Sequence, residues 1–249
     1  MLEIKNVNVT IRHREILKNT SLSLQENSLT VLIGKNGCGK STLLSCIGGT
    51  HPHTGEISIN ETPITSLSLR ERAQRIAILP QHLRAPHMTV ASLVSLGRTP
   101  HRTLGQRFDT EDEAAVTHAL RTTDTDGFAD RYLDELSGGE RQRAYLAMIL
   151  AQDAPILLLD EPTTYMDVAV AHSFMALLRT LVRQQKKTVL TVMHDLNCAL
   201  RYADRVAVMD EGTIVFCGTA AECLATDVID HTFGVQRFEA NGRCFFEGK

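Results

Sequence analysis

The sequence predicts an α/β fold with a mostly parallel buried sheet, an N-terminal antiparallel β subdomain and an inserted α-helical subdomain. Three observations support this prediction. Apolar runs of strand length, such as "ILLL" at 156–159, alternate with helix-like segments, which is typical of a buried parallel sheet. Residues 2–33 alternate in the manner of half-buried strands. Residues 82–135 have the pattern of short helices separated by prolines and glycines.

The other elements follow in chain order. A buried strand, "LTVLIG", leads into a helix expected from Gly39 to Ile47. Further strands are expected at 55–59, 76–80, 155–160 and 188–193. Further helices are expected from Ser137 to about Gln152, at about 168–185 and from Asp195. A hairpin around Gly212 and terminal helices are expected to follow. We expect a single domain over 1–249, with a core at about 1–81 and 154–234, a helical subdomain at about 82–153 and a short C-terminal tail at 235–249.

The composition is that of an ordinary globular protein. The chain has 249 residues, of which 43% are hydrophobic and 22% charged. Its net charge of −3 argues against a broad basic surface for nucleic acid. The sequence lacks a secretory signal and any apolar run near the roughly 20 residues that span a bilayer, so we expect a soluble, cytoplasmic chain. Six scattered cysteines without a C-x-x-C pair predict free thiols.

A phosphate-binding loop is the most specific motif. "GKNGCGKS" at 34–41 matches G-x-x-x-x-G-K-S between a predicted strand and a predicted helix. Its glycines let backbone N–H groups surround phosphate oxygens, and the helix N-terminus adds partial positive charge. We expect Lys40 to reach the β- and γ-phosphates of ATP and Ser41 to hold Mg²⁺. The expected nucleotide-binding residues here are Gly34, Asn36, Gly37, Cys38, Gly39, Lys40, Ser41 and Thr42.

Cys38 lies inside this loop, near the helix N-terminus. That position favours a lowered thiol pKa. We therefore expect alkylation of Cys38 to block ATP binding and ATP to protect it. The alternative is that Cys38 is only a small tolerated side chain.

Three strand ends carry polar groups suited to hydrolysis. Asp160 and Glu161 end the apolar run "PILLLDE", at the edge of a parallel sheet where ligands bind. Asp160 is expected to hold Mg²⁺, and Glu161 is expected to polarise the attacking water. Gln81 is expected to reach Mg²⁺ and the water, and His194 the γ-phosphate.

A second glycine turn, "LSGGERQR", opens another helix. Ser137 and Glu140 form a capping box, which by itself would indicate only helix initiation. Gly138 and Gly139 nevertheless disfavour the first turn by roughly 1 kcal/mol each relative to alanine. Their bare N–H groups suit a second anion site. Because the first loop surrounds its own nucleotide, we expect Ser137, Gly138 and Gly139 to bind the ATP of a second copy in a two-fold, head-to-tail homodimer.

Together these motifs resemble the ATP-binding cassette (ABC) family. "GKNGCGKST", Gln81, "LSGGERQR", "ILLLDEP", Asp167 and His194 occur in the family's order over almost the whole chain. The resemblance implies an ATPase dimer that closes on ATP, opens after hydrolysis and drives a membrane permease at the cytoplasmic face of the inner membrane. It places Asp167 at the dimer contact. It also implies a periplasmic or lipid-anchored binding protein as an indirect partner.

Within the family, the chain resembles ATPases of bacterial iron-chelate importers. "LVSLGRTPH" at 93–101 and "HDLNCALRYADRVAVM" at 194–209 carry this likeness. That subgroup serves ferric siderophores, ferric citrate, haem and cobalamin. One residue departs from the family pattern. Ile11 occupies the position where the family usually has an aromatic residue that stacks on adenine. We expect adenine to be held weakly, or to be covered by Arg12 or His13.

Other functions fit the sequence less well. An importer for another cargo, such as cobalamin or a metal ion, remains the nearest alternative. A soluble ABC ATPase acting on nucleic acid or ribosomes usually has two cassettes or a coiled coil in the insert, and the stretch from Gln81 to Ser137 is too short for one. A small-molecule kinase would not need "LSGGERQR". The "HPH" at 51–53 lacks a third metal ligand, so we interpret it as a loop.

Overall fold

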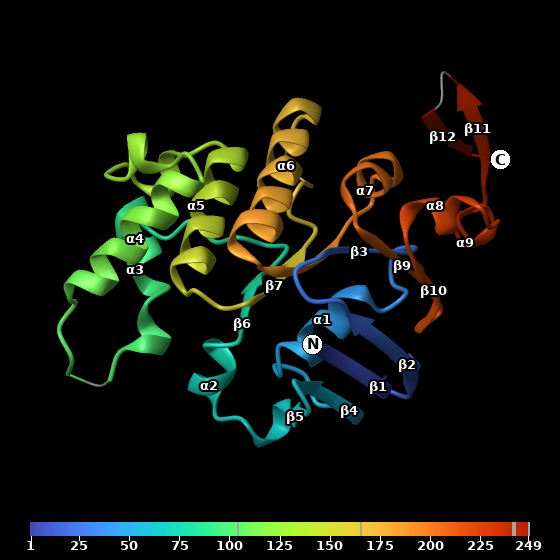
Figure 1. Cartoon of the computed structure of the whole chain (residues 1–249), viewed down its shortest axis with the longest axis horizontal. Helices are drawn as coiled ribbons and strands as arrows, with labels where there is room; N and C mark the ends of the chain where they lie inside the picture. Colours follow the sequence, from blue (N-terminus) through green and yellow to red (C-terminus); the bar gives the residue numbers. More distant parts are fainter. Residues whose placement is uncertain (104, 165, 241–242, 249) are drawn as a thin grey trace. The chain divides into compact units, whose positions relative to one another are not determined.

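The computed structural model describes residues 1–103, 105–164, 166–240 and 243–248 (Figure 1). It divides into two compact units. The first contains residues 1–66 and 179–249, and the second contains residues 67–178. Among the described residues, none of the helices combines the length and apolar character required to cross a bilayer.

The N-terminal part of the first unit is an antiparallel sheet. Its strands are β1 (Leu2–Ile11), β2 (Arg14–Leu24), β4 (Thr54–Ile59) and β5 (Thr62–Pro63), in the order β2-β1-β4-β5. Leu2, Ile4, Val7 and Val9 of β1 are buried, and an irregularity in the pairing between Ile4 and Val7 shifts the alternation by one residue. This confirms the predicted antiparallel β subdomain.

A mostly parallel sheet follows in the same unit. Strand β3 (Leu29–Ile33) pairs in parallel with β8 (Thr188–Val192) and with β9 (Arg205–Asp210). Strand β10 (Thr213–Gly218) closes a hairpin on β9. Every residue of β3 and β8 is buried. Their apolar runs are continuous because both faces of these strands are covered.

The helices of the first unit flank these strands (Figure 1). They are α1 (Lys40–Ile47), α7 (Leu196–Tyr202), α8 (Ala220–Leu224) and α9 (Val228–Phe233), with a 3₁₀ turn at Ile64–Ser66. Helix α6 (Val168–Gln185) contains residues of both units. Each helix that the sequence predicts from residue 168 onwards is present.

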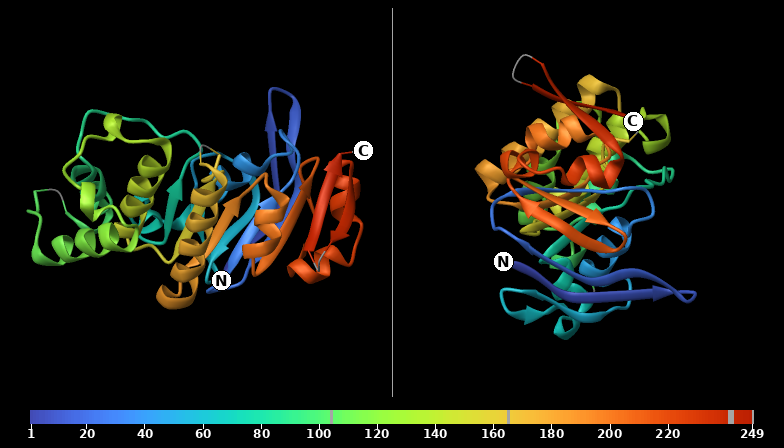
Figure 2. Two further views of the ribbon diagram at one scale, coloured as in Figure 1. Left: turned by 90° about the horizontal axis from the view of Figure 1, so that it is seen from above. Right: turned by 90° about the vertical axis from the view of Figure 1, so that its right-hand side faces the viewer.

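The chain ends in a hairpin that the sequence did not predict. Strands β11 (Val235–Ala240) and β12 (Arg243–Gly248) pair in antiparallel fashion (Figure 2). Phe238 lies opposite Phe245, and both aromatic side chains are largely exposed. An isolated pair of strands lacks the buried face that produces a clear alternating pattern, so this segment looks like an irregular tail in the sequence.

The second unit is mainly helical. Strand β6 (Ile76–Leu79) pairs in parallel with β7 (Ile156–Asp160). Helix α2 (Leu69–Ala73) precedes β6. In the sequence between β6 and β7 there are three α-helices, α3 (Val90–Leu96), α4 (Thr110–Thr122) and α5 (Gly138–Ala151). The same stretch contains 3₁₀ turns at Thr99–His101, Asp126–Phe128 and Leu133–Glu135. The predicted helical insertion is thus confirmed, while its limits at 82 and 153 stay a prediction.

A buried ion pair joins the inserted helices. Arg98 Nε donates to Asp112 Oδ1 at 2.8 Å, and both side chains are almost fully buried. Arg98 Nη1 also donates to the carbonyl of Ala151, the last residue of α5, at 3.0 Å. Arg98 therefore joins the segment after α3 to the start of α4 and the end of α5.

Candidate active site

The phosphate loop connects β3 to α1, and glycines are needed at specific positions in it. A Cβ on Gly34 would lie 2.3 Å from the carbonyl oxygen of Met209. Gly39 has a left-handed φ of 110°, and its Cβ would lie 2.8 Å from Leu17 Cδ2. Side chains at these two positions would clash, so the loop keeps its backbone close to the strands behind it.

Lys40 directs its ammonium into this loop. The side chain is buried, and Nζ donates to the carbonyls of Gly34 at 2.7 Å and Lys35 at 2.9 Å. Among the described residues, no side chain caps the N-terminus of α1. The free N–H groups of the first turn and the lysine together make a positive concavity suited to phosphate.

The loop forms part of the wall of a cavity of about 720 Å³. His13 lines this cavity, whereas neither Ile11 nor Arg12 is among its lining residues. Arg12 and His13 occupy a tight turn with φ values of 47° and 65°. The complete lining is His13, Arg14, Glu15, Ile16, Lys18, Lys35, Asn36, Gly37, Cys38, Asp210, Glu211 and Gly212.

Cys38 differs from the expectation of an activated thiol. Burial raises the pKa of the Cys38 thiol, and the opposing effect of Lys40 is smaller. Only 7% of the residue is exposed. The prediction of a lowered pKa was therefore wrong, because the loss of water around Sγ outweighs the nearby positive charge.

In the second unit, Gln81 and Glu161 are in direct contact. Gln81 Nε2 donates to Glu161 Oε2 at 2.6 Å, although the two residues are far apart in the sequence. Asp160 ends β7, immediately before Glu161. Glu161 has a left-handed φ of 50°, a conformation that disfavours a non-glycine residue by about 1–3 kcal/mol. A strained backbone of this kind is common where a side chain is aimed for chemistry.

The second glycine turn has its own internal bonds. Ser137 Oγ accepts from the Glu140 N–H at 3.3 Å, and Glu140 Oε2 accepts from the Ser137 N–H at 2.8 Å. The bond to the Ser137 hydroxyl, together with the bond to its backbone, lowers the pKa of the Glu140 carboxyl. The predicted capping box is confirmed, with Gly138 and Gly139 as the first two helical residues.

Gly139 has a packing role that the sequence did not indicate. A Cβ there would lie 3.3 Å from Val170 Cγ1, at the start of α6. Asp167 Oδ1 accepts from the Val170 N–H at 2.8 Å, so Asp167 caps α6 in this chain. The first turns of α5 and α6 are therefore packed closely together in the second unit.

The segment after Gln81 is also fixed to α5 and to the residues that precede α5. Tyr145 Oη donates to the carbonyl of Arg84 at 2.8 Å. The Leu133 N–H donates to the Met88 carbonyl, and the Val90 N–H donates to the Arg131 carbonyl, both at 3.0 Å. Within the second unit, the structure thus joins the segment that follows Gln81 to the segment that precedes Ser137.

Comparison with known proteins identifies the family. Residues 17–164 match the model of the ABC transporter family. The chain belongs to this family. It is 44% identical over 222 residues to the achromobactin transport ATP-binding protein of Dickeya dadantii, covering 88% of this chain and 82% of that protein. It is 38% identical over 236 residues to the iron(3+)-hydroxamate import ATP-binding protein of Bacillus subtilis, covering 94% and 88%.

A solved ABC structure has the same architecture. It is a dimeric ATP-binding cassette in a post-hydrolysis state, bound to ADP and phosphate. The TM-score is 0.77 at 29% identity, covering 88% of this chain and 99% of that chain. The chain is therefore an ATP-binding ABC ATPase.

Two further candidate residues of this ABC ATPase, His194 and Ser41, belong to the first unit. His194 follows β8 in the first unit and is exposed, as is Ser41 in the first turn of α1. Among the described residues, no cluster of three or more histidine, cysteine or acidic side chains could hold a metal ion.

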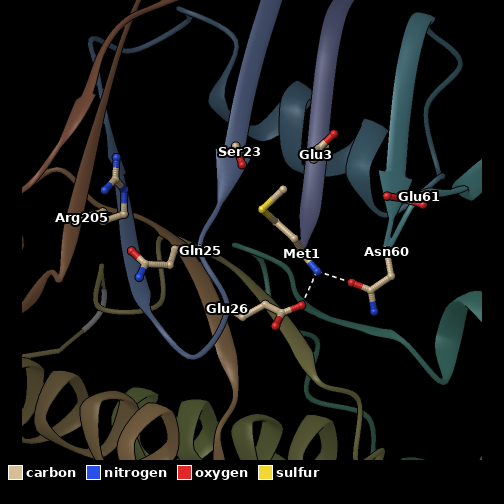
Figure 3. Close-up of a pocket in the computed structure, with 8 residues that line it drawn as sticks. All are labelled: Met1, Glu3, Ser23, Gln25, Glu26, Asn60, Glu61 and Arg205. Atoms are coloured by element: carbon tan, nitrogen blue, oxygen red, sulfur yellow. Dashed lines mark hydrogen bonds and ion pairs between the residues drawn. The ribbon is translucent and has the colours of Figure 1, made fainter.

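The ABC ATPase also has a second cavity, of about 680 Å³, beside its N-terminus (Figure 3). The N-terminal ammonium of Met1 contacts the side chains of Glu26 and Asn60 there. The other lining residues are Glu3, Ser23, Gln25, Glu61 and Arg205. None of these is a candidate site residue in the sequence.

Proposed function

We propose that the chain is the ATP-hydrolysing subunit of a bacterial importer that takes up an iron chelate through a separate membrane permease. The observation that carries the ATPase part is the phosphate loop, in which Lys40 lies among backbone carbonyls below an uncapped helix N-terminus. The chelate part rests on two relatives, an achromobactin transport ATP-binding protein and an iron(3+)-hydroxamate import ATP-binding protein. The subunit would lie peripherally at the cytoplasmic face of the inner membrane.

ATP binding is assigned to the phosphate loop. Lys40 and the N–H groups of Gly37 to Thr42 would hold the β- and γ-phosphates. His13, which lines the cavity beside the loop, is the candidate to cover adenine in place of an aromatic residue at position 11. The exposed His194 is assigned to the γ-phosphate.

Mg²⁺ is the metal that these side chains suit. Ser41, Gln81 and Asp160 offer a hydroxyl, an amide and a carboxylate oxygen, and hard oxygen ligands are those that Mg²⁺ prefers. Gln81 uses its Nε2 for the bond to Glu161, which leaves its amide oxygen for a cation or water. When bound, Mg²⁺ would neutralise charge on the phosphates.

Glu161 is assigned the chemical step. Its carboxylate would accept a proton from water as the water oxygen attacks the γ-phosphorus, and ADP would leave. Gln81 would orient both the carboxylate and the water, since its amide already contacts Glu161.

The second glycine turn is assigned to a dimer. Ser137, Gly138 and Gly139 would contact the ATP of a second copy, and Asp167 would lie near the same contact. The capping box supports this assignment, because it holds the turn in one conformation while using the N–H groups of Ser137 and Glu140 rather than those of the glycines.

The test uses a variant that binds ATP without hydrolysing it. Tagged Glu161→Gln would be expressed in the native cells, and membranes would be solubilised gently with ATP present. We expect a polytopic permease to co-purify, as identified by mass spectrometry, and its binding protein can then be tested with ferric chelates. Lys40→Ala is the matched control and should recover less permease. Recovery of ribosomal proteins or nucleic acid without a membrane protein would contradict the importer and support a soluble ABC ATPase.

A further inference from the structure

Thr164 contacts Glu161 through both its backbone and its side chain. The Thr164 N–H donates to the Glu161 carbonyl at 3.3 Å. Thr164 Oγ1 lies 3.1 Å from the same carbonyl oxygen and 3.3 Å from Glu161 Oε2. One hydroxyl proton is therefore shared between the backbone and the carboxylate of Glu161.

These bonds support a backbone that would otherwise be unfavourable. Glu161 has a φ of 50°, in the left-handed region, and it is neither glycine nor asparagine. Such a conformation persists only where the surrounding structure holds it. The turn from Glu161 to Thr164 supplies this support through the two bonds to the Glu161 carbonyl.

The carboxylate is held from two directions. Gln81 Nε2 and Thr164 Oγ1 both donate to Oε2, and they belong to segments that are distant in sequence. Two donors on one oxygen restrict rotation of the carboxylate more than either donor alone. The adjacent Thr163 is different, because its hydroxyl has no hydrogen bond in the part of the chain that the structure describes.

We infer that Thr164 is a positioning residue for hydrolysis: its hydroxyl fixes the Glu161 carboxylate in the orientation that receives the proton of the attacking water. This inference rests on the proposed role of Glu161. Thr164 does not touch the reacting atoms. Its contribution is to reduce the orientations that the carboxylate samples, and hence to raise kcat without changing ATP binding.

The experiment measures ATP hydrolysis and ATP affinity for three variants of the full chain, at a protein concentration where the wild type hydrolyses ATP. Thr164→Val removes the hydroxyl at nearly constant volume, Thr164→Ser keeps it, and Thr163→Val is the matched control. We expect Thr164→Val to lower kcat by about three- to tenfold, as loss of one modest hydrogen bond predicts. The KM for ATP should stay at the wild-type value, and the thermal midpoint should fall only slightly, because the Thr164 hydroxyl also supports the Glu161 carbonyl. Thr164→Ser should restore most of kcat, and Thr163→Val should behave as wild type.

Two results would overturn the inference. If Thr164→Val keeps the wild-type kcat while Glu161→Gln is inactive, the proposed function stands and the positioning role of Thr164 fails. If Thr164→Val and Thr163→Val lower kcat equally, or Thr164→Ser does not recover activity, the effect belongs to the turn as a whole. A normal rate for Glu161→Gln would instead remove the proposed role of Glu161, and the role of Thr164 with it.

Discussion

Helix α1 begins without a side-chain cap, whereas helix α5 begins with a complete capping box. Both turns are rich in glycine, and both place bare N–H groups at a positive helix end. In the first turn, the Lys40 ammonium donates to a backbone carbonyl of the loop. In the second turn, Ser137 and Glu140 bond to each other. The two helix starts are therefore ordered in different ways: the first has a buried ammonium and no side-chain cap, and the second has its shape fixed by a capping box.

The sharpest test of this difference is Lys40→Ala. Removal of the ammonium should weaken ATP binding by roughly 100-fold or more, because each hydrogen bond to a charged group contributes about 1.5–3 kcal/mol. Equilibrium binding of a fluorescent ATP analogue checks this. Lys35→Ala, in the exposed part of the same loop, is the control and should have a much smaller effect. Equal losses for both variants would show that only the overall charge of the loop matters.

Replacing one glycine of each turn with alanine should change the free energy of unfolding by different amounts in the two turns. Gly34→Ala forces a Cβ to 2.3 Å from the Met209 carbonyl, so we expect a loss of about 1–3 kcal/mol in the free energy of unfolding. Gly139→Ala meets only Val170 Cγ1 at 3.3 Å, and alanine favours the helix by about 0.5–1 kcal/mol, so the two effects should largely cancel. Urea denaturation measures both. A larger loss for Gly139→Ala would reverse the comparison.

Lowering the pH should reduce the stability of the second turn and leave that of the first turn unchanged. The pKa of Glu140 is lowered, first by the Ser137 hydroxyl, from its ordinary value of 4.5. Because the folded-state pKa is the lower one, the stabilisation is present above pH 4.5 and is lost as the pH falls through the folded-state pKa. Glu140→Gln keeps the cap without the charge. It should be less stable near neutral pH by a few tenths of a kcal/mol, and its stability should vary less as the pH falls below 4.5.

The smallest effect concerns the thiol that only the first turn contains. Since burial raises the pKa of Cys38, alkylation by iodoacetamide at pH 8 should be slower than that of the more exposed Cys217. Peptide mass spectrometry with and without ATP measures both rates. We expect ATP to slow the labelling of Cys38 further and to leave Cys217 unchanged. Rapid labelling of Cys38 that ATP does not affect would contradict both its burial and its place in the nucleotide site.

The sequence predicted those features that depend on local pattern. The phosphate loop, the capping box at Ser137 and the buried strand ending at Asp160 each have a signature within a few residues. The contact between Gln81 and Glu161 was not predicted, because it joins residues that only the parallel pairing of β6 and β7 brings together. The hydrogen bond from Thr164 to Glu161 was missed for another reason, because a threonine in a turn belongs to no recognisable motif.

The expectation about the Cys38 thiol failed because of a competing physical effect. The raised pKa of Cys38 could not be inferred from its place near a helix end, because the extent of its burial depends on the tertiary packing around the loop. The sequence left Arg12 and His13 as alternatives to Ile11 beside adenine, and the tight turn at these two residues brings His13 into the lining of the cavity.

The contact between Gly34 and Met209 has a consequence for synthesis on the ribosome. The carbonyl behind the phosphate loop belongs to β9, which pairs with β3 from the far end of the sequence. At roughly 5–20 residues per second, the nascent chain waits on the order of ten seconds or more between making the loop and making the strand that supports it. The second unit, 67–178, is continuous in the sequence and is complete earlier. The emerging polypeptide should therefore acquire the helices of the second unit before it acquires affinity for ATP.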